Sequence, residues 1–575
     1  MINKILPLLV LLNLFSACTR DSERPISVVN IPLSSEVSTL DPANSYDTIS
    51  ATVVYQSLEQ LFEYHYLKRP YSLKPLLAVD MPEVSDDSLT YTIRIKENIR
   101  YHDHPVFGGK PRFLKAQDFI DQIKRLAFYG TQSNGWWLFD GKIIGLNEFR
   151  EAAGTDLEQL FKHEVKGLKA IDDHTLQIKL TEPYPQLLNV LAMSFASPVP
   201  RELIKFYENI LDDVLIGTGP YKLDEWNRGE KIIMRKFEHY HPMHYPSEGD
   251  RLANSRGFLE DAGKQIPFVD QINFRILKEN HIRWQEFIKG NVDFIAIPKD
   301  QHATAIDHRG RLSAELQRKN LQLQVVPSLT YWWLSFNMND PIVGKNYYLR
   351  KAMAHALDVN RYIEVFTSNI GQKANSIYPP GIFGYNPASR PPYEYNLERA
   401  RYYLEKAGYP NGEGLPPITY HVRGSSSTNQ KQADYIAREM AKIGIEVIPA
   451  TIAFPSFLQL ARSGELQFWL DGWALDYPDA ENVLQLLVTR NHSPGPNATF
   501  YSNPEFDQLF DKLRFLPDGD EKEAKMQKLE EIVHSDLPWI MLYYSRDYLL
   551  QHAHLKNYRH SDIIYNYVKY LKLDR

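Results

Sequence analysis

The chain has 575 residues, a formal net charge of −6 and a single cysteine. This length predicts several lobes rather than one domain, and 43% hydrophobic with 24% charged residues is the balance of a soluble globular protein. The slight acidity excludes the basic surface of a nucleic-acid binder. One cysteine excludes an internal disulfide and any zinc site of clustered cysteines.

Residues 1–17 predict a signal peptide, because the apolar run over 5–15 is shorter than the ~20 residues that span a bilayer. The small pair Ser16–Ala17 and then Cys18 resemble the bacterial lipobox, although a phenylalanine stands where the lipobox usually has leucine. We therefore expect lipidation of Cys18, a tether over 18–25, and attachment to a membrane in the periplasm or at the cell-envelope surface. The alternative is an ordinary secretory signal with an incidental cysteine.

The first half of the mature chain predicts strands with few helices between them. One helix is predicted over 50–62, and a second over 115–127 with apolar residues along one side. Apolar and β-branched runs predict strands over 26–33, 90–96, 174–180, 231–237 and 271–278.

The second half predicts an alternation of strands and helices. Residues 416–422 indicate a strand, 430–443 an amphipathic helix and 445–452 a return strand. Gly444 stands where the end of a helix favours positive φ. This βαβ unit predicts a sheet that is at least partly parallel. Further helices are predicted over 349–366 and 520–534, and a strand over 539–544.

Five segments along the chain together suggest a family. They are EVSTLDPANSYD (36–47), FLKAQDFIDQIKRL (113–126), GTGPYKLDEW (217–226), LRKAMAHALDVNR (349–361) and DGWALDYPDA (471–480). In this order they resemble the family 5 solute-binding proteins of ABC importers, the oligopeptide- and dipeptide-binding lipoproteins, over nearly the whole mature chain. The stretch 239–265 is longer than the family's usual turn, and its role is unassigned.

The resemblance implies an α/β fold of the class II periplasmic-binding-protein type, with two lobes, a hinge and an extra domain. Two crossing strands near 328–336 and 539–544 would form the hinge on which the lobes close. The implied divisions are lobe I from 26–58, 180–328 and 542–575, the extra domain from 59–179, and lobe II from 329–541.

The implied function is capture of oligopeptides or dipeptides outside the cytoplasm and delivery to the permease subunits of an ABC importer. The protein would be a monomer without a cofactor, and not an enzyme. Two alternatives remain open. In the first, the same module carries a nickel chelate, an oligosaccharide or another solute; in the second, the chain is a secreted hydrolase whose site is not contiguous in sequence.

The segment 472–479 holds the first candidate ligand-binding residue. Asp476 stands among apolar neighbours, where a carboxylate is costly unless a positive group pairs with it. In the family, the aspartate of the matching GW-x-x-DY segment binds the α-ammonium of the peptide. The resemblance therefore implies a ligand site at Asp476 together with Gly472, Trp473 and Tyr477. The alternative is an aspartate that caps a local turn.

Arg423 follows the strand 416–422, at the strand end where ligands bind in open parallel sheets. Its guanidinium can hold a carboxylate through two hydrogen bonds. In dipeptide-binding members an arginine of the matching loop holds the C-terminal carboxylate of the peptide. The alternative is a solvated loop arginine.

Two further places are candidates for ligand contact. In the family, the segment matching Tyr46, Asp47 and Thr48 lends its backbone to the peptide, as in strand addition. Trp332 and Trp333 lie on the predicted hinge strand and face opposite ways, so at most one lines the cleft; we select Trp333.

Two groups of histidines are dense enough to consider as metal ligands. They are His102 and His104 around Asp103, and His239, His241 and His244. Both lie in polar segments with prolines, where histidine is commonly solvated, so we expect no metal site.

Overall fold

The computed structural model describes residues 26–574, except 46, 299–300, 308, 368–369, 424–426, 453 and 494. The predicted signal peptide, Cys18 and Tyr46 therefore lie outside the described residues. Over the described part of the chain, no helix combines the length and apolar character that crossing a membrane requires.

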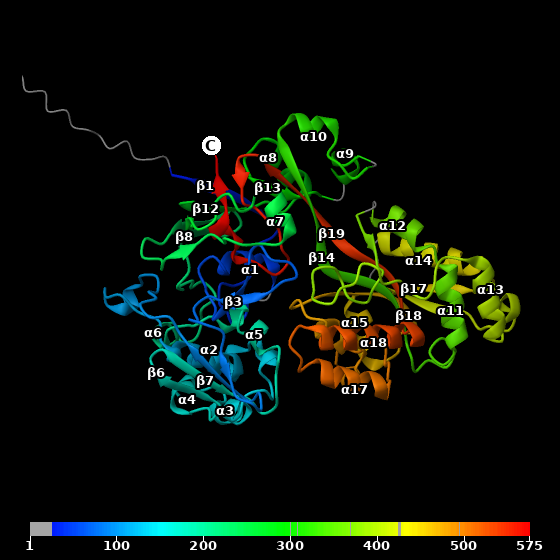
Figure 1. Ribbon diagram of the computed structural model, residues 1–575, viewed down its shortest axis with the longest axis horizontal. Coiled ribbons are helices and arrows are strands. Elements are labelled where there is room, and N and C mark those ends of the chain that lie inside the picture. Colours follow the sequence, from blue (N-terminus) through cyan, green and yellow to red (C-terminus); the bar gives the residue numbers. More distant parts are fainter. Residues whose placement is uncertain are drawn as a thin grey trace, which may run out of the picture.

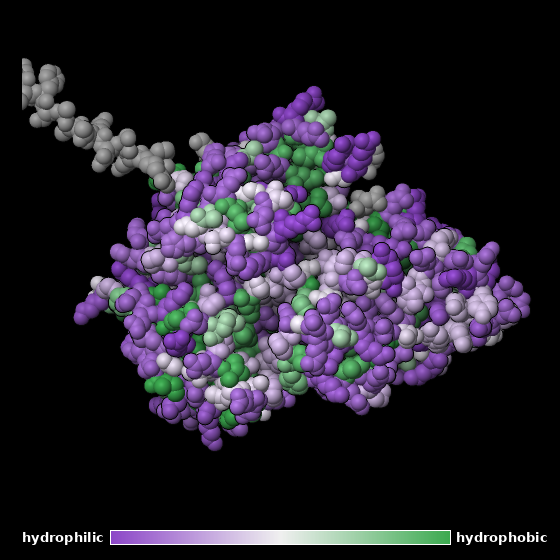
Figure 2. All heavy atoms as spheres, viewed as in Figure 1, coloured by the Kyte–Doolittle hydropathy of each residue, from purple (hydrophilic) through white to green (hydrophobic). Residues whose placement is uncertain are grey.

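The chain folds into two lobes joined by a pair of long strands (Figure 1). These strands are β14 (Leu321–Phe336) and β19 (Trp539–His552), which pair antiparallel along most of their length. The mixture of parallel and antiparallel sheets with helices confirms the predicted α/β class. Hydrophilic residues cover most of the face seen in Figure 2, and hydrophobic residues appear there singly or in small groups.

The first lobe is built around a mixed four-stranded sheet. β1 (Val28–Leu33) runs parallel to β12 (Gln271–Ile276), β12 pairs antiparallel with β9 (Lys231–Lys236), and β9 pairs with β8 (Tyr221–Asn227). Residues from the C-terminal segment, including Tyr558, pack into the same core. Segments far apart in the sequence thus share one sheet and one core.

A second, antiparallel sheet lies below the first lobe in Figure 1. Its strands, in spatial order, are β4 (Glu83–Val84), β5 (Thr90–Arg94), β7 (Thr175–Lys179) and β6 (Leu168–Asp172). Three helices accompany it: α2 (Ala116–Ala127), α3 (Leu146–Ala153) and α4 (Leu157–Lys162). The hydrophobic core of this part continues through Leu203 and Leu211, beyond residue 179. The division of the chain into domains therefore stays a prediction.

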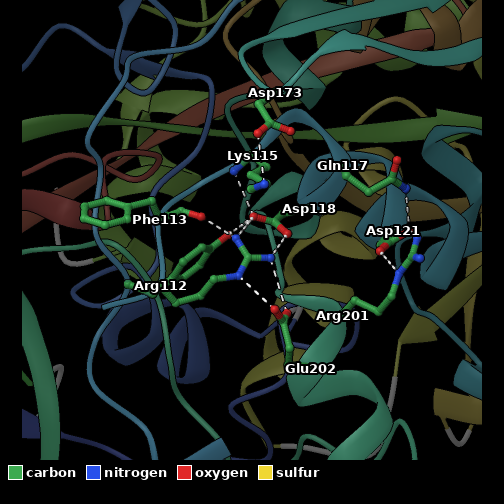
Figure 3. Close-up of polar contacts among 10 residues, drawn as sticks. Arg112, Phe113, Lys115, Gln117, Asp118, Asp121, Asp173, Arg201 and Glu202 are labelled. Carbon is green, nitrogen blue, oxygen red and sulfur yellow. Dashed lines mark hydrogen bonds and ion pairs between the residues drawn. The ribbon is translucent and has the colours of Figure 1, made fainter. Parts of the chain in front are cut away.

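Charged side chains fix the start of α2 against the segments around it (Figure 3). Arg112 donates to both oxygens of Asp118, at 2.6 and 2.9 Å, and Asp118 also accepts from the Lys115 backbone at 3.0 Å. Arg201 holds Asp121 in the same way, at 2.8 and 2.9 Å. These acids of the segment 113–126 are therefore occupied in holding the fold.

The strand pair β14 and β19 belongs to a seven-stranded sheet, and the second lobe contains the parallel part of that sheet. β16 (Ile418–Arg423) runs parallel to β17 (Val447–Ile452) and β18 (Phe468–Ala474), and α14 (Ser427–Ala441) connects the first two. The predicted βαβ unit is confirmed, and Gly444 has a φ of +87°. The other elements of this lobe are α11 (Tyr347–Ala356), α12 (Val359–Thr367), β15 (Gln372–Lys373), α13 (Leu397–Lys406), α15 (Phe454–Ser463), α16 (Glu481–Leu484), α17 (Pro504–Leu513) and α18 (Asp520–Asp536).

The remaining helices and strands are short and lie in or beside the first lobe. They are β2 (Phe62–Tyr64), β3 (Leu73–Pro75), α5 (Leu187–Val190), α6 (Arg201–Phe206), β10 (Met243–His244), α7 (Arg251–Ser255), β11 (Gln265–Ile266), α8 (Asn280–Ile288), β13 (Phe294–Ala296), α9 (His302–Ala305), α10 (Ala314–Arg318), β20 (Leu555–Lys556) and β21 (Lys572–Leu573).

Two predicted helices differ from the structure. The helix expected over 50–62 is only α1 (Thr48–Val54), because the next residues bond to the segment 217–226 instead. The Gly219 amide donates to the Ser57 carbonyl at 2.8 Å, and a Cβ on Gly217 would lie 2.0 Å from that oxygen.

The helix expected over 349–366 is divided into α11 and α12. Asp358 lies between them, and its carboxylate accepts from the Arg361 amide at 3.0 Å. A side chain that caps a new helix start competes with continuation of the old one.

The strand pair between the lobes has an irregular point where it passes from one lobe to the other. Residues 321–327 of β14 pair with 546–552 of β19 in the first lobe, and 331–335 pair with 539–544 in the second. The register shifts between Pro327 and Tyr331. This break lies where the sequence predicts the hinge to begin.

The C-terminal segment supports this irregular point. Asp562 accepts from the Leu329 amide at 2.7 Å and from the Ser328 hydroxyl at 2.9 Å. Burial lowers the pKa of the His560 imidazole, but hydrogen bonds to Asp547 and Asp562 outweigh this effect and raise the pKa to about 9. His560 is therefore a cation at neutral pH and forms an ion pair beside the hinge.

A buried ion pair joins the segments 36–47 and 113–126. Arg125 donates to both carboxylate oxygens of Asp41, at 2.7 and 3.1 Å, and their side chains are 0% and 3% exposed. Arg125 also donates to Asn209 at 2.6 Å, and Asp41 accepts from the Ala43 amide at 2.9 Å. Asp41 is thus a turn residue, as expected, and also the partner of a distant arginine.

Candidate ligand-binding site

The segment after β18 is organised by one buried amide side chain. The Oδ1 atom of Asn482 accepts from the Trp473 indole at 2.8 Å and from the Asp476 amide at 3.2 Å. Its Nδ2 atom donates to the Asp476 carboxylate at 3.3 Å. Asn482 is 0% exposed, so it fixes the half-buried Asp476 relative to Trp473. Asn482, nine residues beyond Trp473, was not predicted from the sequence.

The residues that follow Asp476 support the loop from inside. Tyr477 is buried, and its hydroxyl donates to Glu481, whose pKa burial raises to about 7. Asp479 accepts from the Glu481 amide at 2.8 Å and forms an ion pair with Lys522 at 2.6 Å. Tyr477 therefore packs behind the loop and does not belong to the cavity wall described next.

A cavity of about 260 Å³ lies against the second-lobe sheet. The side chains of Trp469, Asp471 and Trp473 face it, because alternate residues of β18 point to one face of the sheet. Its other walls are Trp333, Arg423, Phe457, Ala461, Gly472, Leu486, Pro496, Ala498, Thr499 and Trp539. The structure thus brings together four predicted site residues: Trp333, Arg423, Gly472 and Trp473.

The two neighbouring tryptophans of β14 have different surroundings. Trp333 lines the cavity and pairs with Asp471 in the sheet register. Trp332 points to the opposite face, where its ring lies 2.6 Å from the place that a Cβ on Gly472 would occupy. A glycine at position 472 is therefore required by the packing of Trp332.

Arg423 and Asp471 give the cavity two opposite charges. Burial raises the pKa of the Asp471 carboxyl, although hydrogen bonds from Trp469 and Gly472 and the charge of Arg423 oppose the rise. The indole of Trp469 donates at 3.0 Å and the Gly472 amide at 2.9 Å. Asp471 was not predicted as a site residue from the sequence. The alternation Trp469–Asp471–Trp473 was the signal that could have identified it.

Asp47 and Thr48 lie at the start of α1 and are not among the residues that line this cavity. The Asp47 carboxylate accepts from the Ile49 and Ser50 amides at 3.0 and 2.8 Å. Burial opposes ionisation of Asp47, but hydrogen bonds from Ser38 and Ser50 lower its pKa. Its side chain is thus occupied as a helix cap, and the Asp47 carbonyl accepts from the Ala51 amide at 2.9 Å.

A second cavity of about 270 Å³ lies beside the hinge and is bordered by both lobes. The stretch 239–265 contributes to its wall, and Pro380 and Gly381 border it from the second lobe. Arg559 anchors that stretch by donating to both oxygens of Asp250, at 2.6 and 3.1 Å. The stretch whose role the sequence left open therefore borders the space between the lobes.

Most of the histidines that were considered as metal ligands have protein partners. His102 lies 2.9 Å from the Gly219 carbonyl, and burial lowers its pKa to about 4. His104 contacts the Tyr207 hydroxyl at 3.0 Å, and His241 contacts Glu59 at 2.9 Å. His239 and His244 are exposed.

Among the residues that the structure describes, one other group has a spacing that a metal ion can bridge. Ligand atoms of Asp547, His560 and Asp562 lie within 4.8 Å of one another. His560 lies 3.1 Å from Asp547 and 3.4 Å from Asp562, so the three side chains partner one another in this structure.

Two lobes on a two-stranded hinge, with a charged aromatic cavity, define a solute-binding protein. The family model of bacterial extracellular solute-binding proteins, family 5, matches residues 72–495, and the chain belongs to this family. The glutathione-binding protein GsiB of Escherichia coli (strain K12) is 25% identical over 540 residues, which are 92% of this chain and 90% of that protein.

Solved structures confirm the predicted fold. HbpA2 from Haemophilus parasuis matches with a TM-score of 0.78 at 21% identity, over 95% of this chain and 100% of that chain. The periplasmic binding protein DppA from Helicobacter pylori, in complex with the peptide STSA, matches with a TM-score of 0.67 at 25% identity, over 95% and 98%. The class II periplasmic-binding-protein fold is therefore confirmed, and the chain is a transport component rather than an enzyme.

Proposed function

We propose that this protein captures short peptides outside the cytoplasm and delivers them to the permease of an ABC importer. The observation that carries the proposal is a pair of opposite charges in the second lobe, one in the wall of the aromatic cavity and one beyond the residues that line it. Arg423 lies in the cavity wall, and Asp476 is held by Asn482 just beyond Trp473. A peptide has a carboxylate at one end and an ammonium at the other, which matches this arrangement.

The proposed roles follow from the chemistry of each group. Arg423 binds the C-terminal carboxylate of the peptide through its guanidinium fork. Asp476 binds the α-ammonium, and Trp473 and Trp333 provide apolar surface between the charges. The backbone of Asp47 and Thr48, at the start of α1 in the first lobe, contacts the peptide when the lobes close.

The relatives support a peptide as the cargo. The ligand in the name of GsiB is glutathione, which is itself a tripeptide, and the DppA structure contains the peptide STSA. Two contacts already join the lobes in this structure: the Tyr71 amide donates to the Gly381 carbonyl at 3.4 Å, and Arg514 lies 3.9 Å from Glu182. Closure on the hinge would enclose the ligand and strengthen its electrostatic contacts.

Native mass spectrometry and calorimetry test the proposal. We expect the purified protein to carry peptides, and after their removal to bind one peptide per chain from a series of two to five alanines. Glutathione, a nickel–histidine chelate and an oligosaccharide form the parallel arms. If the nickel chelate or the oligosaccharide binds, and neither glutathione nor any alanine peptide does, the peptide assignment is wrong while the solute-binding role stands.

We further propose that the protein acts as a monomer on a lipid anchor at Cys18. A chain that carries several acyl groups at one terminus stays on a membrane, whereas one acyl group gives only reversible attachment. Metabolic labelling with a fatty-acid probe is expected to mark the wild type and not Cys18→Ser. Equal labelling of the variant would show that the cysteine is incidental.

A further inference from the structure

The cavity wall includes a charged residue, Asp471, that does not bind either end of the peptide in the proposed function. Arg423 and Asp476 account for the carboxylate and the ammonium of the ligand. Asp471 faces this cavity beside Arg423, from the middle of β18, and the proposed function assigns it no ligand group. Carboxylates are kept in aromatic surroundings only at a cost, so Asp471 requires a physical explanation.

The sheet register places Asp471 beside Arg423. His421 of β16 pairs with Trp469 of β18 in the parallel ladder. Arg423 and Asp471 each lie two residues further along their strands, so they are neighbours on the same face. A ligand carboxylate on Arg423 would therefore bring the adjoining part of the ligand next to Asp471.

Asp471 retains capacity for a positively charged partner. Its carboxylate accepts two hydrogen bonds within the protein, from Trp469 and Gly472. A carboxylate offers about four acceptor positions. Burial also raises its pKa, which shows that these two bonds and the nearby arginine do not fully compensate for the loss of water. A cation from the ligand would supply the missing stabilisation.

The aromatic wall suits the same partner. Trp333 and Trp539 stack with ring centroids 4.5 Å apart, and both line the cavity together with Trp469 and Trp473. The faces of tryptophan rings attract ammonium and guanidinium groups. Trp539 is 2% exposed, and among the described residues its indole N–H has no hydrogen-bond partner. This buried donor is available to an oxygen of the ligand.

We propose that this cavity is a side-chain subsite that selects a lysine or arginine at the C-terminus of the peptide, with Asp471 as its counter-ion. The α-carboxylate binds Arg423, and the cationic side chain enters between the tryptophans to reach Asp471. This inference rests on the proposed function, because it uses Arg423 as the site of the terminal carboxylate. The cavity has a volume of about 260 Å³, which is below the ~300–1,000 Å³ of sites that hold whole drug-sized ligands. The cavity therefore suits one part of a ligand.

Calorimetry with matched peptides tests the subsite. At the length that binds best in the alanine series, the last residue is changed to lysine, Nε-acetyl-lysine, norleucine or glutamate. We expect the wild type to bind the lysine peptide at least ~30-fold more tightly than the acetyl-lysine and norleucine peptides. In Asp471→Asn this preference is expected to fall below threefold, while the norleucine peptide binds as it does to the wild type.

Asparagine keeps an oxygen that can accept from Trp469, so the variant removes mainly the charge. Asp434→Asn, an exposed position on α14, is the matched control and is expected to keep the lysine preference. The comparison of lysine with acetyl-lysine needs no variant, so it remains decisive if Asp471→Asn does not fold.

Four outcomes would overturn the inference. Equal binding of all four peptides by the wild type leaves the proposed function intact but removes the subsite. A preference for glutamate would assign the cavity to Arg423 and Trp539 instead. An equal loss for every peptide in Asp471→Asn would make Asp471 a residue that only positions Arg423. Failure of every peptide to bind the wild type would overturn the proposed function as well.

Discussion

Replacement of Asp476 by asparagine is expected to weaken the binding of a free peptide by roughly 30-fold to several thousand-fold. Loss of a buried charge-assisted contact costs on the order of 2–5 kcal/mol, which corresponds to that range. Asn482 holds both the Asp476 amide and its carboxylate. An asparagine at 476 can still accept from Asn482, so the loop should keep its shape and lose only its charge.

An N-acetylated peptide distinguishes this charge contact from a general defect. Acetylation removes the ammonium, so the wild type should bind the acetylated peptide weakly, and Asp476→Asn should change that weak binding little. Two changes that delete the same interaction are non-additive. Calorimetry on the four combinations measures the coupling. Equal binding of free and acetylated peptides by the wild type would show that Asp476 does not hold the peptide terminus.

Arg125→Met is expected to lower the free energy of unfolding by about 3–5 kcal/mol, because it leaves a buried carboxylate without its counter-ion. The pair Arg125–Asp41 is almost fully buried and bonded through two oxygens. Chemical denaturation followed by circular dichroism measures the loss. The double variant Arg125→Met/Asp41→Asn should lose less than the sum of the two single changes, since no unpaired charge then remains.

An exposed ion pair of the same protein provides the control. Arg94 lies 2.8 Å from Asp80, with side chains 60% and 65% exposed. Pairs of this kind contribute about 0–1 kcal/mol, so Arg94→Met should change stability little. If the two arginine variants lose similar amounts, the buried pair does not hold the segments 36–47 and 113–126 together.

The predicted elements that the structure confirms have a strong local pattern. The amphipathic run over 115–127 forms α2, and the strand, helix and strand over 416–452 form a parallel unit. The shortened helix α1 shows the limit of this reasoning. Its local pattern permits a longer helix, but Gly219, more than 150 residues away, bonds to the Ser57 backbone. A contact so distant in sequence leaves no periodic signal.

The candidate site was predictable only where its residues belong to a local sequence pattern. Trp473 and Arg423 belong to motifs that lie at strand ends, where a resemblance and a topological rule both apply. Asn482 acts through bonds to residues six and nine positions away across an irregular turn, and no repeat marks it. Asp471 obeys the alternation of a strand and could have been found with Trp469 and Trp473.

The strand pair β14 and β19 also determines where the chain of the second lobe begins and ends. The chain of the second lobe leaves β14 after Phe336 and enters β19 at Trp539, and the Phe336 amide donates to the Pro538 carbonyl at 3.1 Å. Its two ends therefore meet at neighbouring positions of one ladder. A segment with adjacent ends is topologically an insertion. It can be exchanged between homologous proteins as one cassette, which would transfer the cavity with its tryptophans and charges while the first lobe stays unchanged.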